Sequence, residues 1–189
     1  MKTRLAIALA SIAFSTFAGA DTYPSKVVTF VVPAVAGGSL DVLARTLAEE
    51  MSRTMGQPVI IDNNPGPAGM IAVQAVARAV PDGHTVLITH SGPILTAPFM
   101  FARVPYDVRR DLAFVSQLCA GQLVLAVNAD KVPARSMKEF VAWAGRNKGK
   151  VSYGSYGIGS AGHLMGAYLS QSRALDMTHV PYKGEPANC

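Results

Sequence analysis

Strand-like apolar runs alternate with helix-like patterns along the first half of the chain. The run KVVTFVVPA, residues 26–34, is rich in β-branched side chains and is typical of a buried parallel strand. Residues 39–56 then place their apolar side chains on one helical face, with Ser39 as the expected N-cap and Gly56 as the stop. The alternation continues through a strand, a helix and a strand, at residues 58–63, 70–83 and 84–91. This order predicts an α/β fold with a parallel, doubly wound sheet.

The second half of the chain has a looser pattern. The prolines in residues 92–111 predict a loop with one short helix. Residues 112–131 carry two strand-like runs, and we expect the chain to cross between two lobes at residues 117–126. A helix, a strand, a helix and a strand follow, at residues 136–149, 150–155, 162–172 and 177–184. The predicted lobes are residues 21–122 (lobe 1, N-terminal part) and 123–189 (lobe 2, partial).

The first twenty residues, 1–20, have the pattern of a secretory signal peptide. Lys2 and Arg4 precede a mostly apolar stretch, residues 5–17, that is too short to span a membrane, and Ala-Gly-Ala at residues 18–20 is a cleavage site. We predict cleavage before Asp21 and export, which makes the mature protein periplasmic. No later run reaches the length of a membrane helix, so we expect no stable membrane insertion.

Composition narrows the classes of partner. The formal net charge of +5 becomes +3 when Lys2 and Arg4 leave with the signal peptide (5 minus 2). Charged residues are only 15 % of the chain and hydrophobic residues 50 %, which indicates a packed globular protein and argues against nucleic-acid binding. The mild positive excess suits a small anionic ligand. Cys119 and Cys189 leave disulfide pairing open, and no ligand spacing of His or Cys predicts a metal site.

A glycine-rich segment, YGSYGIGSAGHL, matches the G-x-G-x-x-G fingerprint of dinucleotide sites at Gly157, Gly159 and Gly162. The strand before it is short and polar, and the acidic candidate Asp176 precedes the next strand instead of ending it, which argues against a nucleotide. Tyr153 stands where a nucleophile elbow needs glycine. No acid–base constellation predicts an enzyme, and no cofactor is expected.

A carboxylate can be bound instead by backbone N–H groups and hydroxyls at the start of helices, beyond the carboxyl ends of parallel strands. Three loops have that position. Their candidate ligand-binding residues are Gly37, Gly38 and Ser39 in the first loop, Ser91 and Gly92 in the second, and Ser155, Gly157, Gly159, Ser160 and His163 in the third. The alternative for each is an ordinary turn or cap. Asp41 is expected to pair with Arg45 at i+4 rather than to contact the ligand.

Several segments in order resemble the periplasmic solute-binding proteins of tripartite tricarboxylate transporters, the TctC or Bug family. They are YPSKVVTFVVP, GGSLDVLAR, GQPVIIDNNPGPAGMIA, VPDGHTVLI, VPYDVRRDLAFVS, VSYGSYGIGSAGHL and HVPYKG. The resemblance implies a two-lobed periplasmic-binding-protein type II-like fold with a ligand cleft between doubly wound lobes. It also implies capture of a small carboxylate, delivery to membrane permease subunits, and no enzymatic activity.

The chain departs from this family in two ways. Its predicted mature length of 169 residues (189 minus 20) is short for the family, so we expect lobe 2 and the C-terminal return to lobe 1 to be incomplete, with weak ligand binding or none. Residues 34–36, Ala-Val-Ala, replace a proline-rich stretch of the first loop. Two alternatives remain: a periplasmic ligand-sensing partner of a membrane sensor kinase, and a non-functional truncated product.

Overall fold

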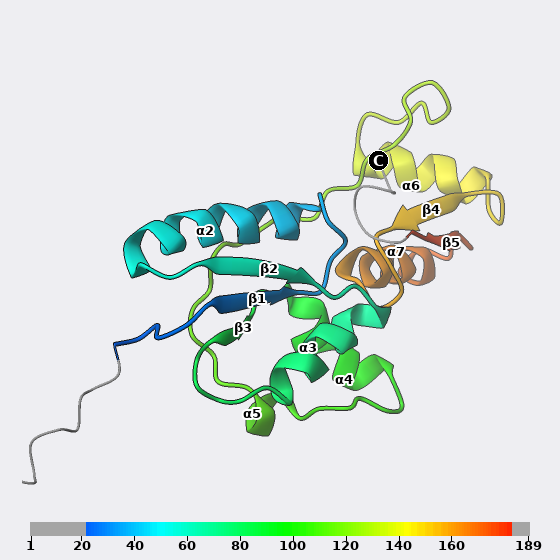
Figure 1. Cartoon of the computed structure of the whole chain (residues 1–189). Coiled ribbons are helices and arrows are strands. Elements are labelled where there is room, and N and C mark those ends of the chain that lie inside the picture. Colours follow the sequence, from blue (N-terminus) through cyan, green and yellow to red (C-terminus); the bar gives the residue numbers. More distant parts are fainter. Residues whose placement is uncertain (1–21, 183–189) are drawn as a thin grey trace, which may run out of the picture.

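A central strand, β1 (Val28–Val32), organises the first sheet of the computed structural model, which describes residues 22–182 (Figure 1). Strands β2 (Val59–Asn63) and β3 (Thr85–Leu87) flank it in the order β2-β1-β3, and both pair with it in parallel. The predicted parallel sheet is therefore confirmed. The predicted signal peptide, residues 1–20, and Cys189 lie outside the described residues.

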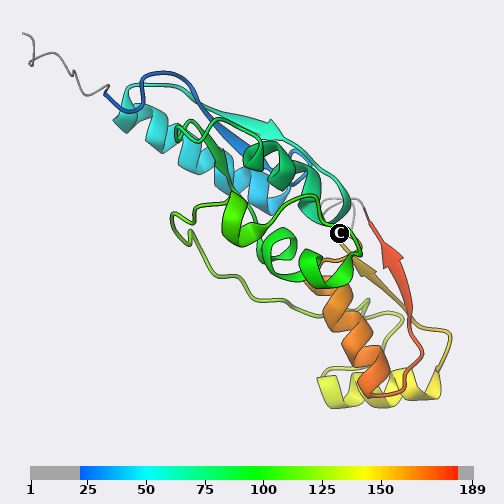
Figure 2. The same ribbon diagram turned by 90° about the horizontal axis from the view of Figure 1, so that it is seen from below.

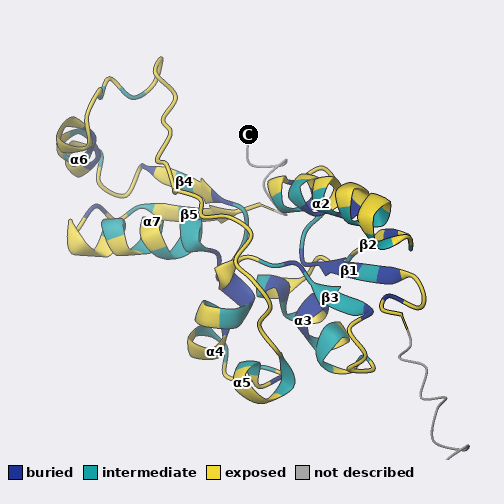
Figure 3. Ribbon diagram, turned by 90° about the vertical axis from the view of Figure 1, so that its left-hand side faces the viewer, coloured by how far each residue is buried: buried dark blue, intermediate teal, exposed yellow. Residues whose placement is uncertain are grey.

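Both faces of β1 are covered by helices, as expected for a doubly wound sheet. Helix α2 (Ser39–Met55) packs against one face, where its Ala44 and Ala48 meet the buried side chains of Val28, Phe30 and Val32. Helix α3 (Met70–Ala77) lies on the opposite face, with Ala72 and Val73 fully buried (Figures 1 and 3). Alanine lets α2 approach closely, and this two-sided burial explains why the β1 run is almost continuously apolar.

Two helix boundaries differ from prediction. Gly38, not Ser39, occupies the N-cap position of α2, and no side chain caps this helix. The predicted stop at Gly56 is confirmed, because this residue adopts the left-handed conformation, φ 68°, that favours glycine. Helix α3 ends at Ala77, well before the predicted end at residue 83. Pro81 cannot continue a helix and disfavours helical geometry in the residue before it, so the chain unwinds early.

Residues 92–111 are more helical than predicted. A π-helical segment, η2 (Gly92–Thr96), leads into α4 (Ala97–Met100), and α5 (Val108–Asp111) follows after a short connection. The prolines do not prevent this because Pro93 and Pro98 stand in the first positions of their segments, where a missing N–H breaks no helical bond. A three-residue 3₁₀ helix, η1 (Pro67–Gly69), lies in the loop before α3.

The segment at residues 112–128 does not form the two predicted strands. It runs as an extended, exposed thread between α5 and the second unit (Figure 3). Val115 is 89 % exposed and Val124 82 %, although their type is typical of strand interiors. A strand requires a neighbour that accepts and donates its backbone hydrogen bonds, and no described strand pairs with this segment.

The second unit is a smaller α/β layer. Strands β4 (Ser152–Ser155) and β5 (Thr178–Pro181) form a parallel pair, packed with α6 (Met137–Arg146) and α7 (Ala161–Ser172) (Figure 2). Its core contains the buried side chains Phe140, Ala144, Val151 and Leu175. The four predicted elements of this half are thus confirmed, with shorter strands. No helix of residues 22–182 has the length and apolarity needed to cross a membrane.

A tight contact fixes α7 on β4. Gly166 of α7 faces the ring of Tyr153, and a Cβ at this glycine would overlap the ring atoms. The Tyr153 hydroxyl donates a hydrogen bond to the carbonyl oxygen of His163, 3.3 Å away, on the same helix. Burial raises the pKa of Tyr153. The absence of a side chain at residue 166 therefore sets how closely helix and strand approach.

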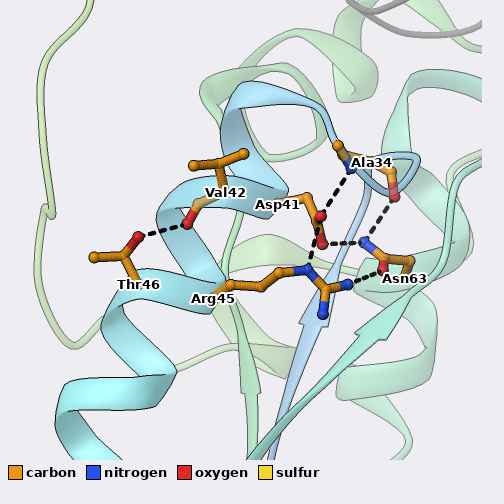
Figure 4. A network of polar contacts seen from close by, with 7 residues as sticks. Ala34, Asp41, Val42, Arg45, Thr46 and Asn63 are labelled. Carbon is orange, nitrogen blue, oxygen red and sulfur yellow. Dashed lines mark hydrogen bonds and ion pairs between the residues drawn. The ribbon is translucent and has the colours of Figure 1, made fainter.

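A buried carboxylate organises the first loop of the sheet (Figure 4). Asp41 is 2 % exposed and accepts hydrogen bonds from the Gly37 N–H and Arg45 Nε, both at 2.9 Å, and from Asn63 Nδ2 at 2.9 Å. Asn63 also donates to the Ala34 carbonyl oxygen at 3.1 Å. The predicted Asp41–Arg45 pair is confirmed, and it is one part of a network that joins β1, β2 and α2.

The pKa of Asp41 is lowered to about 2, first by the Arg45 hydrogen bond, with the Gly37 and Asn63 bonds adding to it against the effect of burial. A carboxylate whose folded pKa lies below its unfolded value of 3.8 stabilises the fold above pH 4 and loses this contribution as the pH falls toward 2. A shift of this size corresponds to about 2 kcal/mol.

We expect Asp41→Asn to lower the free energy of unfolding by about 2 kcal/mol at pH 7, because the charged acceptor of three donors is lost. The difference from wild type should shrink between pH 4 and pH 2. Urea unfolding followed by circular dichroism at several pH values measures both effects. Glu49→Gln is the matched control, since its ion pair with Arg53 is on the surface and should be worth at most about 0.5 kcal/mol. An Asp41→Asn effect that is equal at pH 7 and pH 2.5 would contradict this role.

We expect Gly166→Ala to destabilise the second unit by about 1–3 kcal/mol, because the new methyl group displaces the Tyr153 ring. Gly145→Ala, in α6, is the control: nothing lies within 4 Å of its Cβ position, so only the higher helix propensity of alanine should act, stabilising by up to about 1 kcal/mol. Thermal unfolding of the two variants should therefore shift in opposite directions. A Gly166→Ala protein as stable as Gly145→Ala would disprove the close contact.

Candidate ligand-binding site

The strand order places a topological switch point at one end of the first sheet. The chain leaves β1 through α2 toward β2, and it leaves the sheet on the other side after β3. The loops that follow β1 and β3 therefore diverge, and open α/β sheets bind ligands at such a switch point, beyond the carboxyl ends of the strands. The first and second candidate loops lie at this position.

The first candidate loop is held from within. The Gly37 N–H donates to Asp41, and the Gly38 N–H donates to the Val35 carbonyl oxygen at 3.3 Å. Gly37 adopts a φ of 84°, which a residue with a side chain rarely takes. Ser39 is exposed and is the first helical residue. The positive end of the α2 dipole lies at this loop, beyond the carboxyl end of β1.

The second candidate loop leads directly into a helical segment. Ser91 is exposed immediately before η2, whereas Gly92 is buried. The Gly92 N–H donates to Nδ1 of His90 at 3.1 Å. The Ser91 hydroxyl thus lies at the surface of the predicted site, while a ligand could receive the Gly92 N–H only by replacing the His90 ring.

The third candidate loop, between β4 and α7, surrounds two buried serines. Ser155 is 1 % exposed and Ser160 5 % exposed. Ser160 is the N-cap of α7: its hydroxyl oxygen accepts from the His163 N–H at 3.2 Å, and its hydroxyl donates to Ser155 Oγ at 3.4 Å. Both hydroxyls therefore shape the loop. Gly157, Ala161 and Gly162 around them are half-buried, whereas Gly159 is buried.

A stack of rings lies beneath this loop. The His179 ring of β5 packs between Tyr153 of β4, with centroids 5.0 Å apart, and His163 of α7, with centroids 4.1 Å apart. His179 Nε2 lies 2.7 Å from Ser155 Oγ. Burial lowers the pKa of His179, and the neighbouring His163 lowers it further. We name Ser155, Ser160, His163 and His179 the serine–histidine cluster.

The second and third loops meet across the two units. The Thr96 hydroxyl lies within hydrogen-bond distance of the Gly92 carbonyl oxygen, at 2.9 Å, and of the Gly159 carbonyl oxygen, at 3.1 Å. The His90 and Tyr156 rings form an edge contact with centroids 6.3 Å apart. The start of α7 lies beside η2 and α4 in both Figure 1 and Figure 2. These contacts bring Gly92 and Gly159 to one junction.

Gly159 lies at the centre of this junction. A Cβ at this glycine would lie 3.2 Å from Ala68 Cβ and 3.2 Å from the Phe101 ring, and its φ of 82° belongs to the left-handed region. Its N–H donates to His163 Nδ1 at 3.3 Å. By contrast, the hydrogen bonds of Gly37 and Gly38 stay within the first unit, so the structure joins the second and third candidate loops more closely than the first.

Four residues of this region were absent from the predicted site: Thr96, Tyr156, Tyr153 and His179. Each enters through a contact between segments far apart in the sequence. The register of β4 and β5, which pairs Tyr153 with His179, brings this histidine to the glycine-rich loop. No local pattern indicates that register.

The same register separates Asp176 from the glycine-rich loop. Asp176 precedes β5, at the amino end of the strand, whereas the loop follows the carboxyl end of β4. Because the strands are parallel, the two lie at opposite ends of the sheet. This geometry does not provide the acidic partner of a ribose that a dinucleotide site requires. Among residues 22–182, no three His, Cys, Asp or Glu side chains group as a metal site.

Two hollows of the described surface lie away from the three candidate loops. One, of about 550 Å³, is on the second unit and is bordered by Lys148, Tyr153, Gln171 and Asp176 among others. Another, of about 340 Å³, lies beside Tyr23, Lys26, Asp82 and His84 in the first unit. Neither contains a predicted ligand-binding residue, so these two hollows do not mark the predicted site.

Known proteins with similar sequence and structure belong to one group. Residues 43–188 match the family described as "Tripartite tricarboxylate transporter family receptor", TctC. A protein of Pseudomonas sp. (strain P51), named "UPF0065 protein in tcbD-tcbE intergenic region", is 40 % identical over 181 residues, which cover 94 % of this chain and 53 % of that protein.

Two solved structures have a similar fold. MatC from Rhodopseudomonas palustris with bound malate has a TM-score of 0.71 and 29 % identity, over 86 % of this chain and 55 % of that one. The R. palustris protein Rpa4515 with adipate has a TM-score of 0.70 and 27 % identity, over 86 % and 54 %. The chain spans about half the length of these proteins, which is consistent with an incomplete two-lobed periplasmic-binding-protein fold. It belongs to the TctC family of periplasmic solute-binding proteins.

Proposed function

We propose that this chain serves in the capture of a small carboxylate in the periplasm and its delivery to the membrane permease subunits of a tripartite tricarboxylate-type transporter. The observation that carries the proposal is the junction at Gly92 and Gly159, where helical segments from both units begin. The ligands named with two similar structures, malate and adipate, are both small dicarboxylates.

The chemistry of the loops suits a carboxylate. Residues 88–92 and 155–163 contain no lysine or arginine, so compensation for a negative charge comes from N–H dipoles. At the start of α7, the N–H groups of Ala161 and Gly162 have no acceptor within the helix, and the positive end of the helix dipole lies there. Donors of this kind bind anions without a cationic side chain.

In this proposal the two units provide opposite sides of the site. The first contributes Ser91 and the amino end of α2 with Gly37, Gly38 and Ser39. The second contributes Gly157, Gly159 and the amino end of α7 near Ser160 and His163. The Thr96–Gly159 contact joins the two sides at one edge of the site. Hinge closure around the ligand would complete its enclosure.

We expect malate or adipate to shift the amide resonances of residues 157–162 in a ¹H–¹⁵N NMR titration of the chain at pH 7. The affinity should be millimolar, about −4 kcal/mol, because a few solvent-exposed neutral donors each contribute only about 1 kcal/mol. The dimethyl ester of malate, which lacks the charge, is the control ligand. If these amides do not move at 50 mM dicarboxylate, or move equally with the ester, the proposed site is wrong.

A matched pair of variants tests the contribution of the first unit. Ser91→Ala removes an exposed hydroxyl at the predicted site and should weaken the same titration about fivefold, the effect of one hydrogen bond. Ser152→Ala removes an exposed hydroxyl at the amino end of β4, away from the loops, and should leave the affinity unchanged. Equal affinities of the two variants would exclude Ser91 as a ligand contact.

Export is the second part of the proposal. Bacterial expression of the full sequence should yield a periplasmic protein whose amino terminus is Asp21, measured by intact mass and terminal sequencing of the periplasmic fraction. A chain that starts at Met followed by residue 21 should stay in the cytoplasm. Recovery of uncleaved protein in the cytoplasm would contradict the predicted signal peptide.

A further inference from the structure

The oxygen of the Ser155 hydroxyl has more polar neighbours than it can satisfy at once. It lies 2.7 Å from His179 Nε2, 3.3 Å from the Gly157 nitrogen, 3.2 Å from the Gly157 carbonyl oxygen and 3.4 Å from Ser160 Oγ. A hydroxyl has one hydrogen to donate and two lone pairs that accept. In the Nδ1–H tautomer of neutral His179, Nε2 carries no proton, and protonation of the ring adds one. This proton decides which of these contacts are hydrogen bonds.

When Nε2 of His179 carries no proton, every group is matched. Ser155 donates its hydrogen to Nε2, the shortest of its contacts. Its two lone pairs accept the Gly157 N–H and the Ser160 hydroxyl. The hydrogen and both lone pairs of the Ser155 hydroxyl are then used. The Gly157 N–H and the Ser160 hydroxyl both point toward Ser155 and not toward a ligand.

When Nε2 carries a proton, the Ser155 oxygen faces more hydrogen-bond donors than it has lone pairs. The Nε2–H becomes a third donor toward an oxygen that accepts two, and the Ser155 hydrogen turns to the Gly157 carbonyl oxygen, 3.2 Å away. One of the two donors at longer distance must therefore lose its hydrogen bond to Ser155. Both of them, the Gly157 N–H and the Ser160 hydroxyl, lie in the loop that we propose as a carboxylate site.

His179 and His163 differ in the partners of their ring nitrogens. Nδ1 of His163 accepts the Gly159 N–H at 3.3 Å, so a proton at that nitrogen would break an existing bond. His179 Nε2 faces a hydroxyl, which can donate or accept. The titratable groups packed on the His179 ring are Tyr153 from β4 and His163 from α7, and none of the described ion pairs includes it.

We propose that His179 is a proton-dependent positioning residue that determines whether the Gly157 N–H or the Ser160 hydroxyl is free to bind an anion. The ligand side of this inference rests on the proposed carboxylate function, whereas the hydrogen-bond exchange within the serine–histidine cluster does not. Binding of a carboxylate at the loop favours the protonated form of His179, so binding takes up a proton.

The sign of the pH dependence follows from this linkage. Burial and His163 hold the pKa of His179 below its usual 6.5 in the free chain, and a bound anion raises it. Affinity is constant below the free pKa, falls as the pH rises between the free and the bound pKa, and is constant again above the bound pKa. A rise of one pKa unit corresponds to a tenfold change in affinity.

The change of hydrogen-bond partners within the serine–histidine cluster is measured first, in the chain without ligand. ¹⁵N-imidazole spectra follow the protonation of His179 from pH 5 to 8, and the backbone amides of Gly157 and His163 report the hydrogen bonds to Ser155 and Ser160. We expect at least one of these amides to titrate with the His179 midpoint. Ser155→Ala, which removes the shared oxygen, should abolish that coupling while His179 still titrates. Amides that do not follow His179 in the wild-type chain overturn the proposal, and this measurement needs no variant to fold.

Two substitutions of His179 then separate hydrogen bonding from packing. His179→Phe keeps a ring between Tyr153 and His163 but has no polar atom, so its malate affinity should be equal below and above the wild-type His179 midpoint. His179→Gln keeps a donor toward Ser155 at every pH, and its affinity should stay near the wild-type value measured below that midpoint. An affinity of His179→Gln that varies with pH as in wild type overturns the proposal.

A failure of the carboxylate function and a failure of the coupling to His179 give different results. If Gly157 or His163 follows His179 in the free chain but malate moves no amide of residues 157–162, the carboxylate function fails and the exchange stands. If malate binds wild type with equal affinity below and above the His179 midpoint measured in the free chain, the carboxylate function stands and the coupling to His179 is refuted. About tenfold weaker binding above that midpoint than below it, lost in His179→Phe, supports both.

Discussion

Parallel pairing of the strands is the constraint on which the rest of the structure depends. Because β2 and β3 run parallel to β1, every connection returns over a face of the sheet, and the carboxyl ends gather at one end. The strand order then makes the loops after β1 and β3 diverge. The second unit repeats this geometry with β4, α7 and β5, which explains why α7 also begins near the candidate site.

This geometry has a cost that particular residues offset. The loop after β1 turns sharply at Gly37, whose φ is 84°. Asp41 accepts the Gly37 N–H and also hydrogen bonds from Arg45 and Asn63, so one carboxylate connects this loop, α2 and β2 (Figure 4). In the second unit the equivalent connection is made by hydroxyl groups and imidazole rings, those of Ser155, Ser160, His163 and His179. The first loop is therefore fixed by a charged carboxylate, and the third by hydroxyl groups that can change their hydrogen-bond partners.

Local patterns were sufficient for most helices and strands, and for the Asp41–Arg45 pair, because period and i+4 spacing are properties of a single segment. They failed where a partner far along the chain decides. Residues 112–128 have the composition of strands but lack a described neighbour to pair with, and Pro93 and Pro98 indicate a loop unless one knows that each begins a helical segment. His179 belongs to the same class, since only the β4–β5 register brings it to the glycine-rich loop.

The described polar contacts between the two units lie at the proposed ligand loops themselves. Thr96 contacts the Gly159 carbonyl oxygen, and His90 meets Tyr156, while the covalent connection through residues 112–128 is extended and exposed. A thread of this kind restricts the distance between the units far more than their orientation. The orientation of the units therefore depends on the contacts at this junction, which include the close approach of Gly159 to Ala68 and Phe101. Under the proposed function a ligand would bind beside these contacts, so binding and the orientation of the units would be coupled.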